Sequence, residues 1–237
     1  MQHHALVHPR ATDVVHGFVA ACERRRFSAK AVIIAQGEVS RDLYFLIKGA
    51  ASLRLRTHSG HDLVLSVTHS GSFFGEEGLF ETDALNSAGV RAKSACEVAR
   101  ISHTRLRGHP ALLAGIMPLL APQLALRLDG LFRKTAEMAF YDIETRVTSA
   151  LRELAAAPDA HPHPDGNAIS VTRTELGAMT GASREAVGRV LMRLQERGVV
   201  RAKGRAMIVL TPHAPAPRET TRASSADYVS HASAALL

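Results

Sequence analysis

The chain has little of several residue types on which small stable folds depend. It contains no tryptophan, 8 phenylalanines and 3 tyrosines among 237 residues, so its core must be built from leucine, valine, isoleucine and alanine. It has only two cysteines, Cys22 and Cys96, which are too few for a disulfide framework or a cysteine-ligated iron-sulfur cluster. These shortages exclude the disulfide-rich secreted class and favour a reducing compartment.

Long hydrophobic runs are also missing. No stretch of about 18 uninterrupted apolar residues is present, which is the length that spans a bilayer. The beginning, MQHHALVHPRATD, lacks the charged-then-apolar order of a signal peptide. We therefore expect a cytoplasmic protein with no membrane partner.

Acidic residues are in the minority, because 29 lysines and arginines stand against 22 aspartates and glutamates. A net charge of +7 favours a polyanionic partner. Charge alone does not separate nucleic acid from a membrane surface.

The segment from Phe27 to His103 divides into short pieces rich in β-branched and aromatic residues, with glycine near most corners. Within one piece, Leu53 and Leu55 alternate with arginines, which puts one face inside and the other in solvent. Six to eight strands at this spacing predict a small antiparallel barrel or jelly roll.

From about Pro110 the hydrophobic period changes to one typical of helices. Apolar positions follow a 4-3-4-3 spacing typical of a coiled-coil seam, through Met117, Ala121, Leu124, Leu128, Leu131, Thr135 and Met138. A helix this long would leave its seam uncovered on a small barrel, so we expect pairing with a second copy in a twofold homodimer. The alternative is a helix that lies along its own domain.

The last third of the chain, after the long helix, is expected to contain short helices and a loop. A second helix is expected near residues 142 to 156, and residues 155 to 168 form a loop rich in proline and glycine. A hairpin is expected in VVRAKGRAMIVL, and the residues after Leu210 are expected to form a disordered tail because they lack periodicity.

The stretch VTRTELGAMTGASREAVGRVLMRLQERGVV, residues 171–200, has the pattern of a helix-turn-helix. Thr172 and Glu175 predict a capping box at the first helix, Gly181 permits a tight turn, and Ser183 caps the second helix. The second helix has an apolar face at the spacing i, i+3, i+4, i+7, made by Val187, Val190, Leu191 and Leu194.

The outer face of the second helix carries side chains that can read DNA. Arg184 and Arg189 can each bind guanine O6 and N7, and Glu185 can accept from cytosine N4. Between Val171 and Leu210, eight basic residues stand against three glutamates, which favours attraction to phosphate. The expected phosphate contacts are Arg173, Ser183, Lys203 and Arg205. A solvated basic helical hairpin in a larger fold is the alternative.

These motifs together resemble the cAMP receptor protein (Crp/Fnr) family of bacterial transcription regulators. The similarity runs in order through LYFLIKGAASL, GSFFGEEGLF, VRAKSACEVARIS, MAFYDIETRV and the helix-turn-helix stretch, and it covers roughly residues 18 to 210. The resemblance implies an α+β fold with a β jelly-roll cyclic-nucleotide-binding domain, a long dimerisation helix and a C-terminal winged helix-turn-helix.

The resemblance also implies domain bounds: an N-terminal extension (1–17), the jelly roll (18–109), the dimerisation helix and hinge (110–141), the DNA-binding domain (142–211) and the tail (212–237). It places Arg184, Glu185 and Arg189 on the family's base-reading positions, which implies a palindrome of TGTGA-like half-sites. The loop around Pro162 and His163 matches the surface by which family members contact RNA polymerase.

The nucleotide pocket of the family is only partly matched. The residues at the family's nucleotide-binding positions are Gly75, Glu76, Asn86, Ser87, Ala88 and, on the long helix, Arg127. Asn86 stands where cAMP-binding members have an arginine, so the charge-assisted contact to the cyclic phosphate is missing. Leu131 and Phe132 replace the threonine and serine that contact adenine.

Three possibilities for the effector therefore stay open. The sequence RRRF, residues 24–27, resembles the Clp-like branch that responds to cyclic di-GMP, so a cyclic dinucleotide is favoured. A mononucleotide such as cAMP and the absence of any effector are the two alternatives. For the function as a whole, a cyclic-nucleotide sensor that acts through protein contacts is a further alternative. Glu76 and Glu77 are adjacent and would point to opposite sides, and no activated nucleophile is recognisable, so an enzyme is not expected. The thirteen histidines show no metal-ligand spacing, and we expect no metal.

Overall fold

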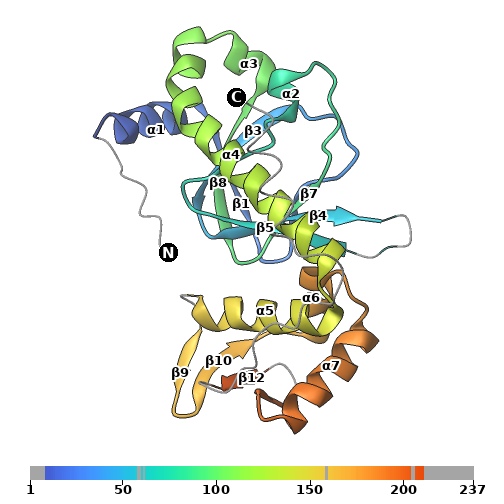
Figure 1. The fold of residues 1–237 in the computed structure, drawn as a ribbon. Coiled ribbons are helices and arrows are strands. Elements are labelled where there is room, and N and C mark those ends of the chain that lie inside the picture. The colour runs from blue at the N-terminus through green and yellow to red at the C-terminus, as the bar shows by residue number, and fades with distance from the viewer. Residues whose placement is uncertain (1–8, 58–59, 61, 158–159, 204–205, 211–237) are drawn as a thin grey trace, which may run out of the picture. The chain divides into compact units, whose positions relative to one another are not determined.

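The computed structural model describes residues 9–57, 60, 62–157, 160–203 and 206–210 (Figure 1). The chain divides into two compact units at the Phe132–Arg133 boundary. Each unit is described by itself. The predicted tail after Leu210 lies outside the described residues.

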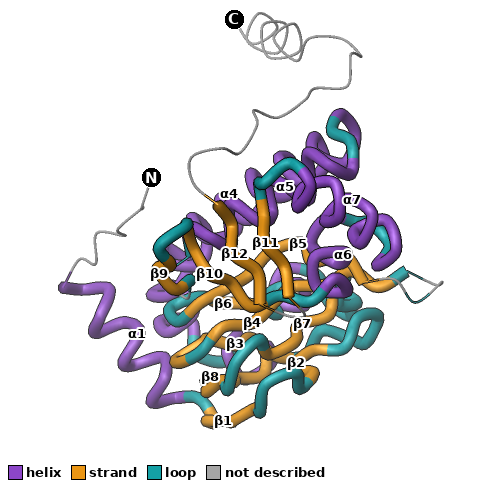
Figure 2. Tube along the Cα trace, turned by 90° about the horizontal axis from the view of Figure 1, so that it is seen from below, coloured by secondary structure: helices purple, strands orange, loops and turns teal. Residues whose placement is uncertain are grey.

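The N-terminal unit contains two four-stranded antiparallel sheets, whose strands are drawn in orange in Figure 2. One sheet has the order β1-β8-β3-β6, and the other has the order β2-β7-β4-β5. The bounds are β1 Glu23–Phe27, β2 Val32–Ile34, β3 Asp42–Lys48, β4 Ala50–Arg56, β5 Asp62–His69, β6 Phe73–Phe74, β7 Gly89–Ala92 and β8 Cys96–Ser102. The predicted jelly roll is confirmed.

Alternation along the strands divides the unit into two cores. On β3, Leu43 and Phe45 face one cluster, which also contains residues of the long helix, while Leu46 faces a second cluster shared with β4 and β7. Because successive strand residues point to opposite faces, one sheet contributes to both clusters. This arrangement leaves the inner side of the first sheet, where Tyr44 lies, facing the second sheet.

Helix α1, Pro9–Ala21, is an element that the sequence pattern does not predict. Its Phe18 is fully buried, with its ring centroid 5.3 Å from that of Phe73 and 6.4 Å from that of Phe45. Such edge-to-face contacts are the favoured geometry of aromatic pairs. Much of the stretch expected to be an extension is therefore a helix attached to the core.

The predicted long helix is α4, Pro110–Phe140, of 31 residues, which corresponds to about 46 Å. It follows two short helices, α2 (Glu77–Phe80) and α3 (His103–Arg107). By length and composition α4 could cross a membrane, with a mean hydropathy of 1.6 in its most apolar window. Ile116 and Leu120 are nevertheless fully buried in the N-terminal unit, so this part packs against protein; the absence of a membrane partner stays a prediction.

The C-terminal unit packs three helices on a small antiparallel sheet of order β11-β12-β10-β9. The bounds are α5 Ile143–Ala156, β9 His161–His163, β10 Gly166–Ser170, α6 Arg173–Thr180, α7 Arg184–Glu196, β11 Val200–Lys203 and β12 Ala206–Leu210. The helix near 142–156 and the terminal hairpin are confirmed. The loop predicted over residues 155–168 is wrong in part, because β9 and the start of β10 pair within it.

Candidate functional site

The turn between α6 and α7 is held by the residues that the sequence predicts. Thr172 and Glu175 form the complete capping box at α6, and Gly181 ends that helix with a φ of 63°. The Ser183 side chain accepts a hydrogen bond from the backbone N–H of Ala186 and so caps α7. These local interactions satisfy N–H groups that a helix terminus would otherwise leave unpaired.

One face of α7 is fixed in the core of the C-terminal unit. Val187, Val190, Leu191 and Leu194 are at most 2% exposed, and they pack in one cluster with residues of α5, α6 and the sheet. Because these residues occupy one face of the helix, the opposite face is held toward solvent.

The exposed face of α7 presents the three side chains expected to read bases. Arg184, Glu185 and Arg189 are all exposed, and in the described part of the chain neither arginine has an ion-pair or hydrogen-bond partner. Hydrogen bonds from its own backbone N–H and from the Ser183 hydroxyl lower the pKa of Glu185, with further help from the two arginines. The glutamate is therefore ionised and suited to accept a hydrogen bond.

Other basic residues of this unit are engaged in ion pairs that hold the fold. Arg193 donates to Glu144 at 3.0 Å, and Arg197 pairs with the same carboxylate. These two hydrogen bonds outweigh partial burial and lower the pKa of Glu144. Arg201 pairs with Asp165 at 2.8 Å. The basic side chains of α7 thus divide into two arginines near its beginning that stay available and two near its end that attach α5.

Arg173, at the start of α6, is exposed beside α7. A Cβ atom at Gly188 would lie 3.7 Å from the Arg173 Nη1 atom, so the guanidinium lies over the glycine. Gly188 is consequently buried under this side chain. The side chain of Lys203 and all of Arg205 lie outside the described residues, and their phosphate contacts stay predictions.

Gly177 is a residue of this site that sequence reasoning missed. A Cβ atom there would lie 2.6 Å from the Ala182 carbonyl oxygen, which is shorter than any normal contact. The same residue accepts hydrogen bonds at its carbonyl from Gly181 and Ala182. The only signal in the sequence for this requirement is that a glycine stands five residues before Ala182, where the tight turn ends.

The second candidate site is the loop that joins β6 to β7. Gly75 has a φ of 80°, and a Cβ atom there would lie 2.6 Å from the Asp42 carbonyl oxygen. At Gly78 a Cβ atom would lie 2.0 Å from the Ser40 carbonyl oxygen. Both glycines are therefore required by close packing of the loop against the segment that enters β3. Glu77 helps to close the loop by accepting from the Ser87 N–H at 2.9 Å.

Glu76 lies largely buried beside the long helix, with 13% of its side chain exposed, and is paired with Arg127. The Arg127 Nη1 atom lies 2.5 Å from Glu76 Oε1, and the Nη2 atom donates to the Phe73 carbonyl at 2.7 Å. Burial raises the pKa of Glu76, and the attraction of Arg127 offsets part of that rise. Glu76 Oε2 is buried without a hydrogen-bond partner among the described residues, so the carboxylate can accept from a ligand hydroxyl.

Asn86 turns its side chain away from this pair. It is 6% exposed, and its Nδ2 atom donates to the Ala35 carbonyl at 3.2 Å. Ser87 beside it is exposed and Ala88 is half-buried. The structure thus brings Glu76 and Arg127 together, while Asn86 contacts the segment after β2.

The residues of the predicted dimer seam differ in their surroundings. Leu124 packs against the core of the N-terminal unit, whereas Leu128 is 51% exposed. Leu131 is half-buried and Thr135 is exposed. The Met138 sulfur accepts from Arg146 at 2.6 Å and lies near Gly181 within the C-terminal unit. Neighbouring apolar side chains are exposed on the same helix, namely Leu126, Phe132 and Phe140.

The histidines are not brought together in the described ranges. Among those residues, no group of three histidine, cysteine, aspartate or glutamate side chains could hold a metal ion. His163 instead accepts a hydrogen bond from the Asp165 N–H. The two cysteines are free thiols, and burial raises the pKa of Cys22 to about 12.

Comparison with known proteins finds a family model for each of the two units. Residues 24–108 match the family model described as a cyclic nucleotide-binding domain, and residues 145–214 match that of a Crp-like helix-turn-helix domain. The chain is 41% identical over 208 residues to the cAMP-activated global transcriptional regulator Vfr of Pseudomonas aeruginosa, which covers 86% of this chain and 97% of Vfr. It is 37% identical over 201 residues to the cAMP-activated regulator CRP of Pasteurella multocida, with 85% and 96% covered.

A solved structure is similar over the same range. The c-di-GMP responsive global regulator CLP of Xanthomonas campestris superposes with a TM-score of 0.81 at 32% identity, and the match covers 85% of this chain and all of CLP. The two matching domains, the long helix between them and the extent of sequence identity all indicate the same family. The chain therefore belongs to the Crp/Fnr family of transcription regulators, which are not enzymes.

Proposed function

We propose that this protein is a dimeric regulator that binds palindromic DNA with TGTGA-like half-sites and responds to a cyclic nucleotide. The observation that carries the proposal is the exposed face of α7, where Arg184, Glu185 and Arg189 have no competing ion pairs among the described residues while the opposite face is fully buried. A rigid helix with free polar side chains near its beginning is what reading of the major groove requires.

Each of the three side chains has a matching base. Arg184 and Arg189 donate to guanine O6 and N7, and the ionised Glu185 accepts from cytosine N4. Arg173 and the capping Ser183 are placed to bind phosphate beside them, and Lys203 and Arg205 extend this contact along the hairpin of β11 and β12. The half-site is read by α7, and the surrounding cations contribute binding that does not depend on sequence.

The exposed apolar side chains of α4 support the proposed dimerisation. Leu128 and Phe132 are 51% and 64% exposed, and a twofold axis along the helix would cover both copies with the same contact. Two recognition helices then read half-sites one turn of DNA apart. DNA as the target implies a cytoplasmic location, and the β9–β10 hairpin with Pro162 and His163 is the proposed contact for RNA polymerase.

The proposed effector is a cyclic nucleotide, with cyclic di-GMP favoured over cAMP. Asn86 carries no charge, and its amide is already bonded to Ala35, so the loop offers a cyclic phosphate no cation of its own. CLP is described as responsive to c-di-GMP, whereas Vfr and CRP are described as cAMP-activated. The partnerless Glu76 Oε2 atom supports a hydroxyl-bearing ligand of either kind.

A regulator without an effector is the second candidate. It is favoured by the pair between Glu76 and Arg127, because two groups that would contact a nucleotide are already bonded to each other. In that case DNA affinity would not change with any cyclic nucleotide.

Fluorescence anisotropy with a labelled TGTGA-N6-TCACA duplex tests the proposal. We expect specific binding that weakens steeply as salt rises and changes on addition of cyclic di-GMP. Arg184→Ala should relax preference at one base pair by about 1 to 3 kcal/mol. Arg193→Ala is the matched control on the same helix, because Arg193 pairs with Glu144 and should leave base preference unaltered. Equal affinity for a scrambled duplex would refute the proposal.

A further inference from the structure

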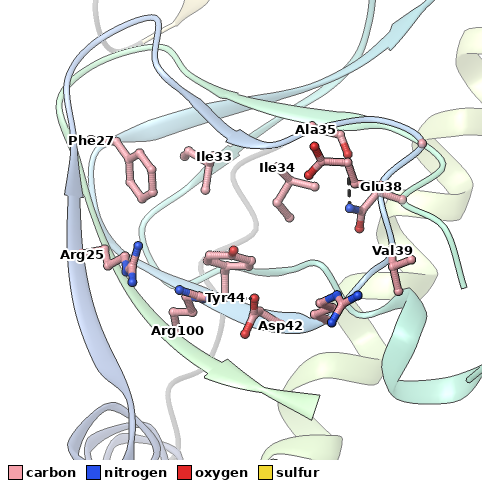
Figure 3. Close-up of a pocket in the computed structure, with 13 residues that line it drawn as sticks. Arg25, Phe27, Ile33, Ile34, Ala35, Glu38, Val39, Asp42, Tyr44 and Arg100 are labelled. Atoms are coloured by element: carbon pink, nitrogen blue, oxygen red, sulfur yellow. Dashed lines mark hydrogen bonds and ion pairs between the residues drawn. The ribbon is translucent and has the colours of Figure 1, made fainter. Parts of the chain in front are cut away.

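A cavity of about 640 Å³ opens on the inner side of the first sheet, away from the Glu76–Arg127 pair. Figure 3 shows it between Arg25 and Phe27 of β1, Tyr44 of β3 and the residues of β2. Neither Glu76 nor Arg127 lines it. Its volume is in the range of small-molecule sites. We call it the β1–β3 cavity.

Strand alternation supplies the charged wall of this cavity. Successive residues of β1 point to opposite faces, so Arg25 and Phe27 line the cavity while Arg24 and Arg26 pair with Glu97. The strands β1 and β3 both pair with β8. The neighbouring side chains of three strands therefore meet on one surface.

The arginines of the cavity retain donors that the protein does not use. The Arg100 Nη2 atom donates to Asp42 at 2.8 Å, but its Nε atom is buried without a partner in the described part of the chain. Arg25 donates only its Nε atom to Glu23, at 3.0 Å. The Arg41 side chain is exposed and has no hydrogen bond or ion pair among the described residues. A buried donor without a partner is unfavourable, and an anionic ligand would satisfy it.

The charged and aromatic side chains that line the cavity together favour a ligand with phosphate and guanine groups. Guanidinium groups bind phosphate oxygens and also guanine O6 and N7. The carboxylates of Glu38 and Asp42 can accept from the adjacent N–H donors on the other edge of guanine, which adenine lacks. Phe27 and Tyr44 add aromatic surface on which a base can stack.

We propose that the β1–β3 cavity is a binding site for a cyclic dinucleotide of guanine, with the phosphodiesters bound by Arg25, Arg41 and Arg100. This inference rests on the proposed function, in which cyclic di-GMP is the favoured effector. It gives the sequence RRRF a physical role, because Arg25 and Phe27 are the two members of that motif whose side chains line the cavity.

The same wall connects the cavity to the loop that carries Asn86. The Asn86 N–H donates to the Glu38 carbonyl, the Gly37 N–H donates to the Asn86 carbonyl, and the Asn86 side chain donates to Ala35. A ligand that contacts Glu38 therefore contacts the segment to which this loop is bonded. Asn86 itself lines the cavity, so occupancy of the cavity can reposition the loop without a nucleotide contacting the Glu76–Arg127 pair.

Isothermal titration calorimetry with cyclic di-GMP on the full chain tests this site. We expect Arg25→Gln and Arg41→Gln each to weaken binding on the order of tenfold, since each removes a charge-assisted contact. Both side chains are exposed, so folding should be retained. Arg26→Gln is the matched control, on the same strand but on the opposite face, and should bind within about twofold of the unaltered protein.

The variant Arg127→Gln distinguishes cyclic di-GMP binding in the cavity from binding in the loop. Unaltered cyclic di-GMP affinity in this variant supports the cavity. Lost affinity in Arg127→Gln with full affinity in Arg25→Gln and Arg41→Gln would assign the ligand to the loop and overturn the inference, while the proposed function would stand. Absence of cyclic di-GMP binding to the unaltered protein would also overturn it, and the anisotropy measurement would then show independently whether specific DNA binding persists.

Discussion

Two glycines of the helix-turn-helix should differ in how the stability of the protein responds when each is replaced by alanine. Both Gly177 and Gly188 lie inside helices, so each Gly→Ala change gains about 1 kcal/mol of helix propensity. At Gly188 the new Cβ atom would meet the Arg173 guanidinium at 3.7 Å, an ordinary contact. At Gly177 it would lie 2.6 Å from the backbone oxygen of Ala182, and relief of such overpacking costs about 1 to 3 kcal/mol.

The difference between the two variants isolates the contact, because the propensity gain is common to both. Gly188→Ala should raise the free energy of unfolding by about 1 kcal/mol. Gly177→Ala should lie about 1 to 3 kcal/mol below Gly188→Ala. Tryptophan is absent, so far-UV circular dichroism in urea is the suitable probe, with hydrogen exchange of α6 and α7 amides reporting on the C-terminal unit alone.

The reasoning would be refuted if the two variants had equal stability. Equality would mean that the turn relaxes without a penalty and that Gly177 is not required by its close approach to Ala182. A variant with a larger residue at Gly177 that retained the protection of α6 amides would lead to the same conclusion.

The remaining predictions concern three polar clusters. Burial lowers the pKa of His103, so its contribution to stability is present above its ordinary value of about 6.5 and is lost as pH falls; urea midpoints from pH 7 to 5 should fall more steeply for the unaltered protein than for His103→Gln, and equal slopes would contradict this. Glu144→Gln should destabilise the C-terminal unit by about 1 kcal/mol without changing base preference, as measured by hydrogen exchange and anisotropy. Arg127→Ala should cost about 3 to 5 kcal/mol in urea denaturation because it leaves the Glu76 carboxylate buried and unpaired, whereas the double change with Glu76→Gln should recover part of this loss; no recovery would count against the pairing.

Much of the DNA-reading element could be predicted because its signals are local. A capping box, a turn glycine and an apolar face at helical spacing each depend on residues within one or two turns. Thr172 with Glu175 and the cap at Ser183 are therefore found where the sequence places them. The strand pieces of the N-terminal unit are visible for the same reason. The alternation expected within β4 holds only in part, because Leu53 is buried whereas Leu55 is 38% exposed, and the pairing with β5 shifts register between Leu53 and Arg54.

Features that depend on distant contacts could not be predicted in this way. Helix α1 has a weak local pattern, and its position is decided by burial of Phe18 against rings from β3 and β6. The pairing of β9 with β10 places strands in a segment whose prolines indicate a loop. The need for glycine at Gly177 arises from a carbonyl five residues later, which no local propensity describes.

The sequence by itself determined the order of the elements, the family and the residue types of the recognition helix. Periodicity, caps and base-reading side chains each depend only on a short stretch of sequence. Only the tertiary structure decided which charges are available. It engages Arg193 and Arg197 with Glu144 and leaves Arg184 and Arg189 free in the described part of the chain. It also turns Asn86 toward Ala35 and brings Arg25, Arg100 and Tyr44 from three strands to one cavity. Such partnerships are set by how strands and helices pack across the chain, and this distance in sequence is why the residues alone do not reveal them.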